Sequence, residues 1–243
     1  MKYLALISAL AAVIAVVACA QKPSDPNVES FKAKGGTVDI ACINHGSISI
    51  SYKDYLIQID PVKADEYEAS PKADVILITH EHGDHYNKDV IASLSKDDTR
   101  VIANGKVHDM LGYGEVMANG DRTEAGKGIV IEATPAYNTT EGREQFHPKG
   151  NGNGYLFTVG GLRVFVSGDS EDIEEYAQLK DIDVAFLSAS QPYTMTVEQC
   201  IHAAKVINPK VLVPYHLGNT DMQAIKDGLE GTGIEVRLHE TLR

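Results

Sequence analysis

The spacing of hydrophobic residues changes along the chain. Apolar and polar residues alternate over 37–52 and again over 55–62, as in paired strands, and the segment 73–80 opens with an apolar run typical of a central strand. In the last third, helical spacing alternates with short apolar strands. This order predicts an α/β (α+β) chain with two sheets, each covered by helices on its outer side. The expected helices cover 87–98, 106–114, 172–179, 196–207 and 220–230.

Turn and cap residues support several of these boundaries. Asn87 stands where it can cap the first helix, and either Gly112 or Gly114 can end the second one. The glycine pair at 160 and 161 divides an apolar stretch and predicts a hairpin. Together these signals place strands and helices within one continuous domain, expected over 37–243.

The first twenty residues differ from everything that follows. A single basic residue, Lys2, precedes an almost unbroken apolar run that ends in "VVACA". This is typical of a secretory signal peptide, which we place at 1–18. The "VVAC" end resembles the lipobox of bacterial lipoproteins, so Cys19 would carry a lipid anchor and 19–36 would form a polar tether. Cleavage after Ala20, giving a secreted protein, and an uncleaved anchor are the alternatives.

The charge of the chain limits its possible partners, and its few cysteines limit its possible disulfides. The chain carries a formal charge of −12, and loss of Lys2 with the signal adds one more negative charge. Because an acidic surface repels polyanions, we expect no nucleic-acid partner. With Cys19 lipidated, only Cys42 and Cys200 remain, and their apolar surroundings favour buried free thiols, although one bridge is permitted in an oxidising compartment.

A cluster of ionisable residues follows the apolar run at 73–80. His80 and His82 are two apart, so an extended segment would present both imidazoles to one metal ion. Asp84 and His85 follow Gly83, which can turn the chain and direct them to a second ion. A solvated histidine-rich loop is the alternative, but this spacing directly after a strand favours metal binding.

Four residues are too few for a paired metal site, so further ligands are needed. Three later residues stand where an apolar strand or loop ends, namely His147, Asp169 and His216. The order "THEHGDH", histidine, "SGDS", "PYH" resembles the metal-binding motifs of the metallo-β-lactamase-fold hydrolases. The likeness extends over "DPV" at 60–62, "PAYN" at 135–138 and "HPKGNGNGY" at 147–155. It implies a four-layer αββα sandwich of two mixed sheets.

The resemblance also implies a role for each residue. One ion would be held by His80, His82 and His147, the other by Asp84, His85 and His216, and Asp169 would bridge them. Asp60 would orient a ligand imidazole, and His45 would lie near the site, although a purely structural histidine is the alternative for His45. The candidates for substrate contact are residues of the surrounding loops, namely His45, Tyr137, Asn138 and Tyr193.

The expected activity is hydrolysis by a hydroxide that bridges two metal ions, with Asp84 orienting it or moving its proton. Two zinc ions are expected, with iron or manganese possible. The substrate would be an ester, lactone, amide or phosphodiester of a small or lipid-derived molecule. β-Lactams are disfavoured because Asp169 stands where common metallo-β-lactamases have cysteine. The alternatives are an iron-dependent sulfur-oxidising oxidoreductase and a non-catalytic metal-binding lipoprotein. The expected location is extracytoplasmic, on a membrane through the lipid anchor.

Overall fold

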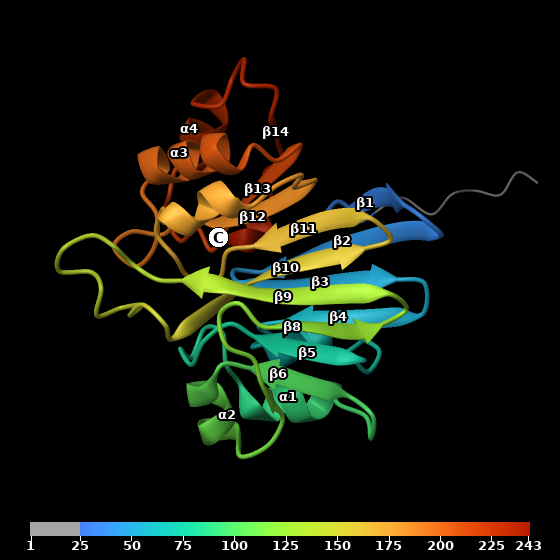
Figure 1. Cartoon of the computed structure of the whole chain (residues 1–243). Coiled ribbons are helices and arrows are strands. Elements are labelled where there is room, and N and C mark those ends of the chain that lie inside the picture. Colours follow the sequence, from blue (N-terminus) through green and yellow to red (C-terminus); the bar gives the residue numbers. More distant parts are fainter. Residues whose placement is uncertain (1–24) are drawn as a thin grey trace, which may run out of the picture.

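The computed structural model describes residues 25–243, which form two seven-stranded sheets packed face to face (Figure 1). The first sheet has the strand order β1 to β7. Its strands are β1 (Val28–Ala33), β2 (Gly36–Asn44), β3 (Ser47–Tyr52), β4 (Tyr55–Ile59), β5 (Val75–Ile78), β6 (Arg100–Ala103) and β7 (Glu115–Val116).

The second sheet has the order β14-β13-β12-β11-β10-β9-β8. In both sheets the early strands pair antiparallel and the later strands pair parallel, so each sheet is mixed. Its strands are β8 (Arg122–Gly126), β9 (Ile129–Ala136), β10 (Gly152–Val159), β11 (Leu162–Val166), β12 (Val184–Ser188), β13 (Val211–Tyr215) and β14 (Glu235–Val236).

The main core lies between the two sheets. Alternate residues of β2, such as Val38 and Ile40, face alternate residues of β10, such as Tyr155 and Phe157, and all four are fully buried. Burying one such side chain contributes about 1.5–3 kcal/mol. The apolar residues that the two sheets bury against each other therefore stabilise the sandwich.

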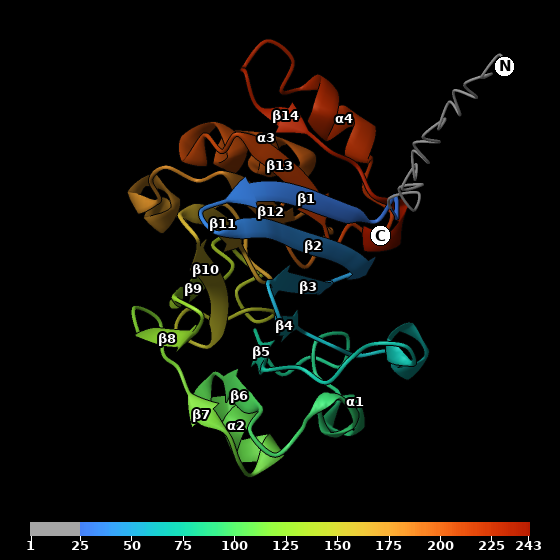
Figure 2. The ribbon, with the colours of Figure 1, turned by 90° about the vertical axis from the view of Figure 1, so that its right-hand side faces the viewer.

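Helices cover the outer faces, as Figure 2 shows from the side. Helices α1 (Lys88–Leu94) and α2 (Gly105–Leu111), with the 3₁₀ turn η1 (Ala64–Tyr67), pack on the first sheet. Helices α3 (Val197–Ile207) and α4 (Met222–Asp227), with η2 (Glu174–Gln178), pack on the second. A last 3₁₀ turn, η3 (Glu240–Leu242), contacts β2. The predicted four-layer αββα fold is confirmed.

Most of the predicted caps are confirmed as well. The Asn87 side chain accepts hydrogen bonds from the first turn of α1, and Gly112 ends α2 in a left-handed conformation. Gly160 and Gly161 form the β10–β11 turn, since Val159 pairs with Leu162. The helix expected at 172–179 is a short 3₁₀ turn instead, because only Tyr176 of η2 is buried and the segment has no side-chain cap.

The folded part begins earlier than the expected tether boundary at 36. Residues 28–33 form β1, which pairs antiparallel with β2 in a register from Val28↔Ala41 to Ala33↔Gly36. Local sequence gave no sign of this strand because its stability comes from pairing with β2. The signal peptide and Cys19 lie outside the described residues. Within 25–243, no helix has the length and apolarity needed to cross a bilayer.

Candidate metal centre

The predicted ligands meet at one edge of the sandwich because each follows the carboxyl end of a strand. Asp60 follows β4, His80 follows β5, Asp169 comes shortly after β11, and His216 follows β13. His147 lies in the long loop that joins β9 to β10. Strand direction therefore places residues from distant parts of the sequence at the same end of the two sheets.

Three histidines form a first cluster. The ligand atoms of His80, His82 and His147 lie within 4.8 Å of one another, and His80 Nε2 is 3.1 Å from His82 Nδ1. Nδ1 of His147 donates to the Tyr193 carbonyl at 3.0 Å, and Nδ1 of His80 contacts Thr79 Oγ1 at 3.0 Å. With Nδ1 protonated in this way, Nε2 of His80 and of His147 is unprotonated, and its lone pair faces the cluster.

Asp169 is the carboxylate at the centre of the site. Its Oδ2 lies 3.3 Å from His147 Nε2, 3.3 Å from His216 Nε2 and 3.5 Å from His85 Nε2. Its side chain is only 3% exposed, and Oδ1 is buried without a hydrogen-bond partner. A buried carboxylate among imidazoles from both sheets suits a bridging ligand, the role that the sequence resemblance implies.

The second cluster differs from the predicted one. The ligand atoms that lie within 4.8 Å of one another belong to His45, Asp84 and His216. His85 groups instead with His80 and Asp169, although its Nε2 lies 3.9 Å from Asp84 Oδ2. The structure thus adds His45 to the predicted set and places His85 between the two clusters.

Asp60 orients His85, as expected for a carboxylate behind a ligand. Its Oδ2 accepts from His85 Nδ1 at 2.7 Å and from Thr79 Oγ1 at 2.6 Å, while Oδ1 accepts from the Thr79 amide. Burial raises the pKa of Asp60, and the charge and hydrogen bond of His85 oppose that rise. Because Nδ1 of His85 is used in this way, Nε2 is the nitrogen left for a metal.

The protonation of the centre depends on burial and on neighbouring charge. Burial and the neighbouring His85 hold the pKa of His80 well below 6.5. Burial also tends to lower the pKa of His85, but Asp169 and Asp60 outweigh it and hold that pKa well above 6.5. The hydrogen bond with His216 and the neighbouring His45 ring hold the pKa of Asp84 far below its usual range. The shifts thus differ in direction, with His80 favoured neutral and His85 favoured protonated.

Unpaired buried atoms test whether metal ions fit here. Within the described chain, several buried atoms of the centre have no hydrogen-bond partner, which is costly unless another group binds them. Imidazole nitrogens and carboxylate oxygens are the donors that zinc, iron and manganese accept in hydrolytic centres. The residues therefore fit bound metal. The atoms concerned are His85 Nε2, His147 Nε2 and Asp169 Oδ1.

A buried glutamate supports the loop that carries His147. The Glu171 carboxylate accepts from the amides of Thr139 and Thr140 at 2.8 and 2.7 Å, and it pairs with Arg143 at 3.3 Å. Its side chain is fully buried. Burial raises the pKa of Glu171, but the hydrogen bonds from these two amides outweigh it and lower the pKa. Sequence reasoning missed this residue, and the only local signal is its place two residues after Asp169.

The loop residues proposed as substrate contacts have supporting roles in the structure. Tyr137 OH bonds Glu175 at 2.8 Å and Lys149 at 2.9 Å. The Asn138 amide donates to the Tyr193 carbonyl at 2.7 Å, and the same carbonyl accepts from His147. The Tyr193 side chain is 47% exposed. Substrate contact by these residues stays a prediction.

Thr79 and Asn104 were also missed by sequence reasoning. Asn104 caps α2 through the Val107 amide, and its Nδ2 donates to the Asn151 carbonyl at 2.9 Å. Asn151 in turn donates to Glu81, the residue between the first two ligand histidines. These bonds tie the end of the His147 loop to the His80–His82 segment. The position of Asn104, directly after a strand, was the available signal.

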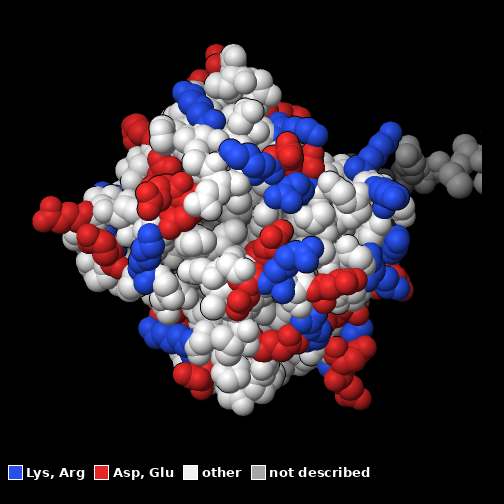
Figure 3. Space-filling model, in the orientation of Figure 1, with Lys and Arg blue, Asp and Glu red and all other residues white. Residues whose placement is uncertain are grey.

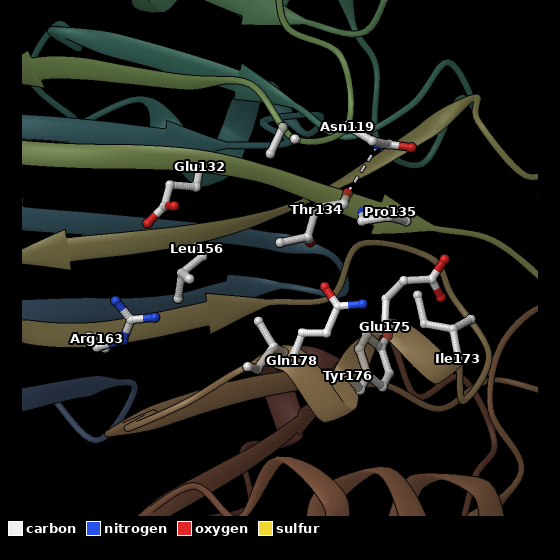
Figure 4. A pocket seen from close by; sticks show the side chains of 13 residues that line it. Asn119, Glu132, Thr134, Pro135, Leu156, Arg163, Ile173, Glu175, Tyr176 and Gln178 are labelled. Carbon is white, nitrogen blue, oxygen red and sulfur yellow. Dashed lines mark hydrogen bonds between the residues drawn. The ribbon is translucent and has the colours of Figure 1, made fainter.

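A separate cavity of about 420 Å³ lies on the outer face of β9, β10 and β11, beside η2 (Figure 4). Glu132, Thr134, Leu156 and Arg163 line it, together with residues of η2. No predicted metal ligand lines this cavity. Its position on the far side of the sheet from the core separates it from the metal centre.

Known proteins share both the sequence and the fold. The profile of the beta-lactamase superfamily domain matches residues 39–216. A UPF0173 metal-dependent hydrolase of Bacillus pumilus is 30% identical over 77% of this chain and 91% of its own, and one of Nanoarchaeum equitans is 26% identical over 81% and 94%.

Among solved structures, a candidate metal-dependent hydrolase of Parabacteroides distasonis is 49% identical, with a TM-score of 0.85 over 88% of this chain and 98% of that one. The matched region contains every predicted metal ligand, from His80 to His216. The chain belongs to the UPF0173 metal-dependent hydrolases of the beta-lactamase superfamily.

Proposed function

We propose that this protein hydrolyses its substrate with two metal ions held side by side. The observation that carries the proposal is the position of Asp169, whose Oδ2 lies within 3.8 Å of nitrogens of His80, His85, His147 and His216. A carboxylate so placed suits a bridge between two ions. His80, His82 and His147 would hold one ion, and Asp84, His85 and His216 the other.

Bound ions would act as Lewis acids and make water a nucleophile near neutral pH. Among the proposed ligands, His82 is partly exposed and the Asp84 side chain is 50% exposed, whereas the others are buried. Substrate would therefore approach from the side of His82 and Asp84. The contacts of Asp84 use Oδ2, so Oδ1 remains free to hold or move a proton at the reacting group.

The two described cysteines offer no competing nucleophile. Cys42 and Cys200 are free and buried, and burial raises the pKa of each to about 12. A thiolate is therefore scarce at neutral pH. This supports water, rather than a side chain, as the nucleophile toward an ester, lactone, amide or phosphodiester of a small or lipid-derived molecule.

A panel of chromogenic esters, lactones, amides and phosphodiesters tests the proposal. We expect turnover of at least one class that disappears after chelation, returns with zinc, manganese or iron, and falls more than about 100-fold in Asp84→Asn. Asp89→Asn, an exposed change in α1, is the matched control and should be neutral. Turnover that survives complete metal removal would contradict the proposal.

We also propose that the protein is anchored outside the cytoplasm through a lipid on Cys19. The lipobox-like sequence supports this, although it lies outside the described residues. Acidic and basic side chains are interspersed over the face in Figure 3, and the net charge of −12 supports a small-molecule rather than nucleic-acid partner. Cys19→Ala should move the protein from the membrane to the soluble fraction, and unchanged membrane retention would argue against lipidation.

A further inference from the structure

We propose that His45 is itself a metal ligand and supplies a nitrogen to the second ion, beside Asp84 and His216. This inference rests on the two-ion site of the proposed function and adds to it a residue from the turn between β2 and β3.

Geometry places the His45 ring directly in the second cluster. Its centroid lies 3.8 Å from that of His216, and Nε2 lies 3.5 Å from Asp84 Oδ2. A nitrogen–oxygen separation of 3.5 Å is too long for a strong hydrogen bond. A cation between the two atoms accounts for this arrangement better than direct contact does.

The hydrogen bonds of His45 leave the correct nitrogen for a metal. Nδ1 lies 2.9 Å from the main-chain oxygen of Arg243, and only a protonated Nδ1 can donate to that oxygen. Nε2 of the neutral His45 ring is then unprotonated, and its lone pair faces Asp84. His147 and His85 are held in the same way, each by an oxygen on Nδ1 with Nε2 toward the centre.

The backbone around His45 is held in an uncommon conformation by contacts with the rest of the site. His45 has φ of +47°, and His216 has φ of +51°. The His216 amide donates to the His45 carbonyl at 3.2 Å, and the His45 amide donates to the Thr241 carbonyl at 2.9 Å. Positive φ at a non-glycine residue costs free energy, so such residues gather where function requires a fixed direction.

The C-terminal segment completes this support. Thr241 Oγ1 donates to the Cys42 carbonyl at 3.0 Å, and the Leu217 amide donates to the Leu242 carbonyl at 3.1 Å. Figure 2 shows the C-terminus beside the end of β2. The turn also lies against His85, since a Cβ on Gly46 would be 2.7 Å from its Cε1. Residues 240–243 thus fix His45 and His216 together.

Ligation by His45 makes the two ions unequal. The second ion would then have more side chains around it than the first, which would have three imidazoles and the bridging carboxylate. The side chains around the second ion are His45, Asp84, His85, His216 and Asp169.

Metal binding tests this without any substrate. His45→Asn is the chosen variant because asparagine tolerates positive φ, so folding should be preserved. Zn²⁺ competition against a chromophoric chelator should give two ions per chain for the wild-type protein. In His45→Asn one ion should bind as in the wild type, and the other should bind more than about tenfold less tightly. His108→Asn, in α2, is the matched control and should bind like the wild type.

A second readout uses the unaltered side chain. With ¹¹³Cd²⁺ as the probe, His45 Nε2 should show scalar coupling to the second cadmium in ¹⁵N-labelled protein. Two ions of unchanged affinity in His45→Asn, or a His45 without cadmium coupling, would overturn the inference and leave the two-ion proposal intact. A wild-type protein that binds only one ion would overturn both.

Discussion

The two halves of the metal centre are built in different ways. His80 and His82 come from one loop after β5, and bonds from His80 to Thr79 and from His147 to the Tyr193 carbonyl orient the first cluster. In the second cluster, His45 and His216 come from opposite ends of the folded chain and are tied through residues 240–243. The local motif supplies two of the three ligands of the first cluster but only Asp84 of the second, whose two histidines depend on the finished fold.

The largest expected effect comes from the residue that the two halves share. Asp169→Asn keeps the volume of the side chain but removes its negative charge and introduces an N–H group among imidazole nitrogens. We expect both ions to bind more than about 100-fold less tightly, with a comparable loss of turnover. Metal content after dialysis, measured by mass spectrometry, checks this. Loss of one ion with full retention of the other would show that Asp169 belongs to one half only.

Asp60→Asn should affect His85, which lies between the two clusters. The amide would present N–H to His85 Nδ1, so the ring would change tautomer and lose its Nε2 lone pair. We expect a drop of about 10- to 100-fold in the affinity for one ion. Isothermal titration with Zn²⁺ measures it. Equal weakening of both ions would mean that Asp60 supports the whole edge rather than His85.

Glu171→Gln should weaken metal binding only at the first cluster, and by less than Asp60→Asn weakens it. The neutral amide still accepts hydrogen bonds from the Thr139 and Thr140 amides but no longer pairs with Arg143, so the His147 loop is held less firmly. We expect a drop of about tenfold in the affinity of the first ion. Because the folded pKa of Glu171 is lowered, wild-type protein should lose the same support as pH falls below 4.5.

The matched control for that variant is Glu141→Gln, which changes an exposed carboxylate of the same loop. It should bind both ions like the wild type at every pH. If the two glutamine variants behave alike, the burial and hydrogen bonds of Glu171 have no part in orienting His147, and the comparison between the halves loses one of its supports.

The smallest expected effect is the release of protons when metal binds. The pKa of His85 lies well above 6.5 in the metal-free protein, so this ring is charged at pH 7 and must lose its proton to bind metal. Metal binding at pH 7 should therefore release about one proton from His85, and affinity should rise with pH until the folded pKa is passed. Titrations in buffers of different ionisation enthalpy count it.

Folding stability of the metal-free protein depends on pH in the opposite direction. A folded pKa above 6.5 stabilises the metal-free protein fully below pH 6.5, and that contribution is lost as pH rises through the folded value. Thermal unfolding of the metal-free protein against pH checks this direction. A metal-free protein that gains stability over the same rise in pH would show that His85 is not the charged group.

Sequence alone predicts the part of this molecule that local chemistry specifies. The apolar run before His80 and the spacing of His80, His82, Asp84 and His85 indicate a metal loop at a strand end, and the order of strands and helices along the chain predicts two sheets. The remaining ligands, at 147, 169 and 216, were candidates because each stands where an apolar strand or loop ends, and the resemblance to a known family was needed to divide the ligands between two ions.

Other features could not be predicted because their cause is tertiary. β1 is stable only through pairing with β2, so its own sequence resembles a tether. Glu171 is an ordinary acidic loop residue until the Thr139 and Thr140 amides close around it. His45 becomes part of the centre only when residues 240–243 fold back on β2.

The most direct test of the central claim is stepwise return of metal to the metal-free protein while turnover is followed on one active substrate. The account predicts that two ions bind per chain, that Asp169→Asn abolishes binding of both, and that full activity requires both ions. A protein that binds a single ion per chain and reaches full activity with it would contradict the account.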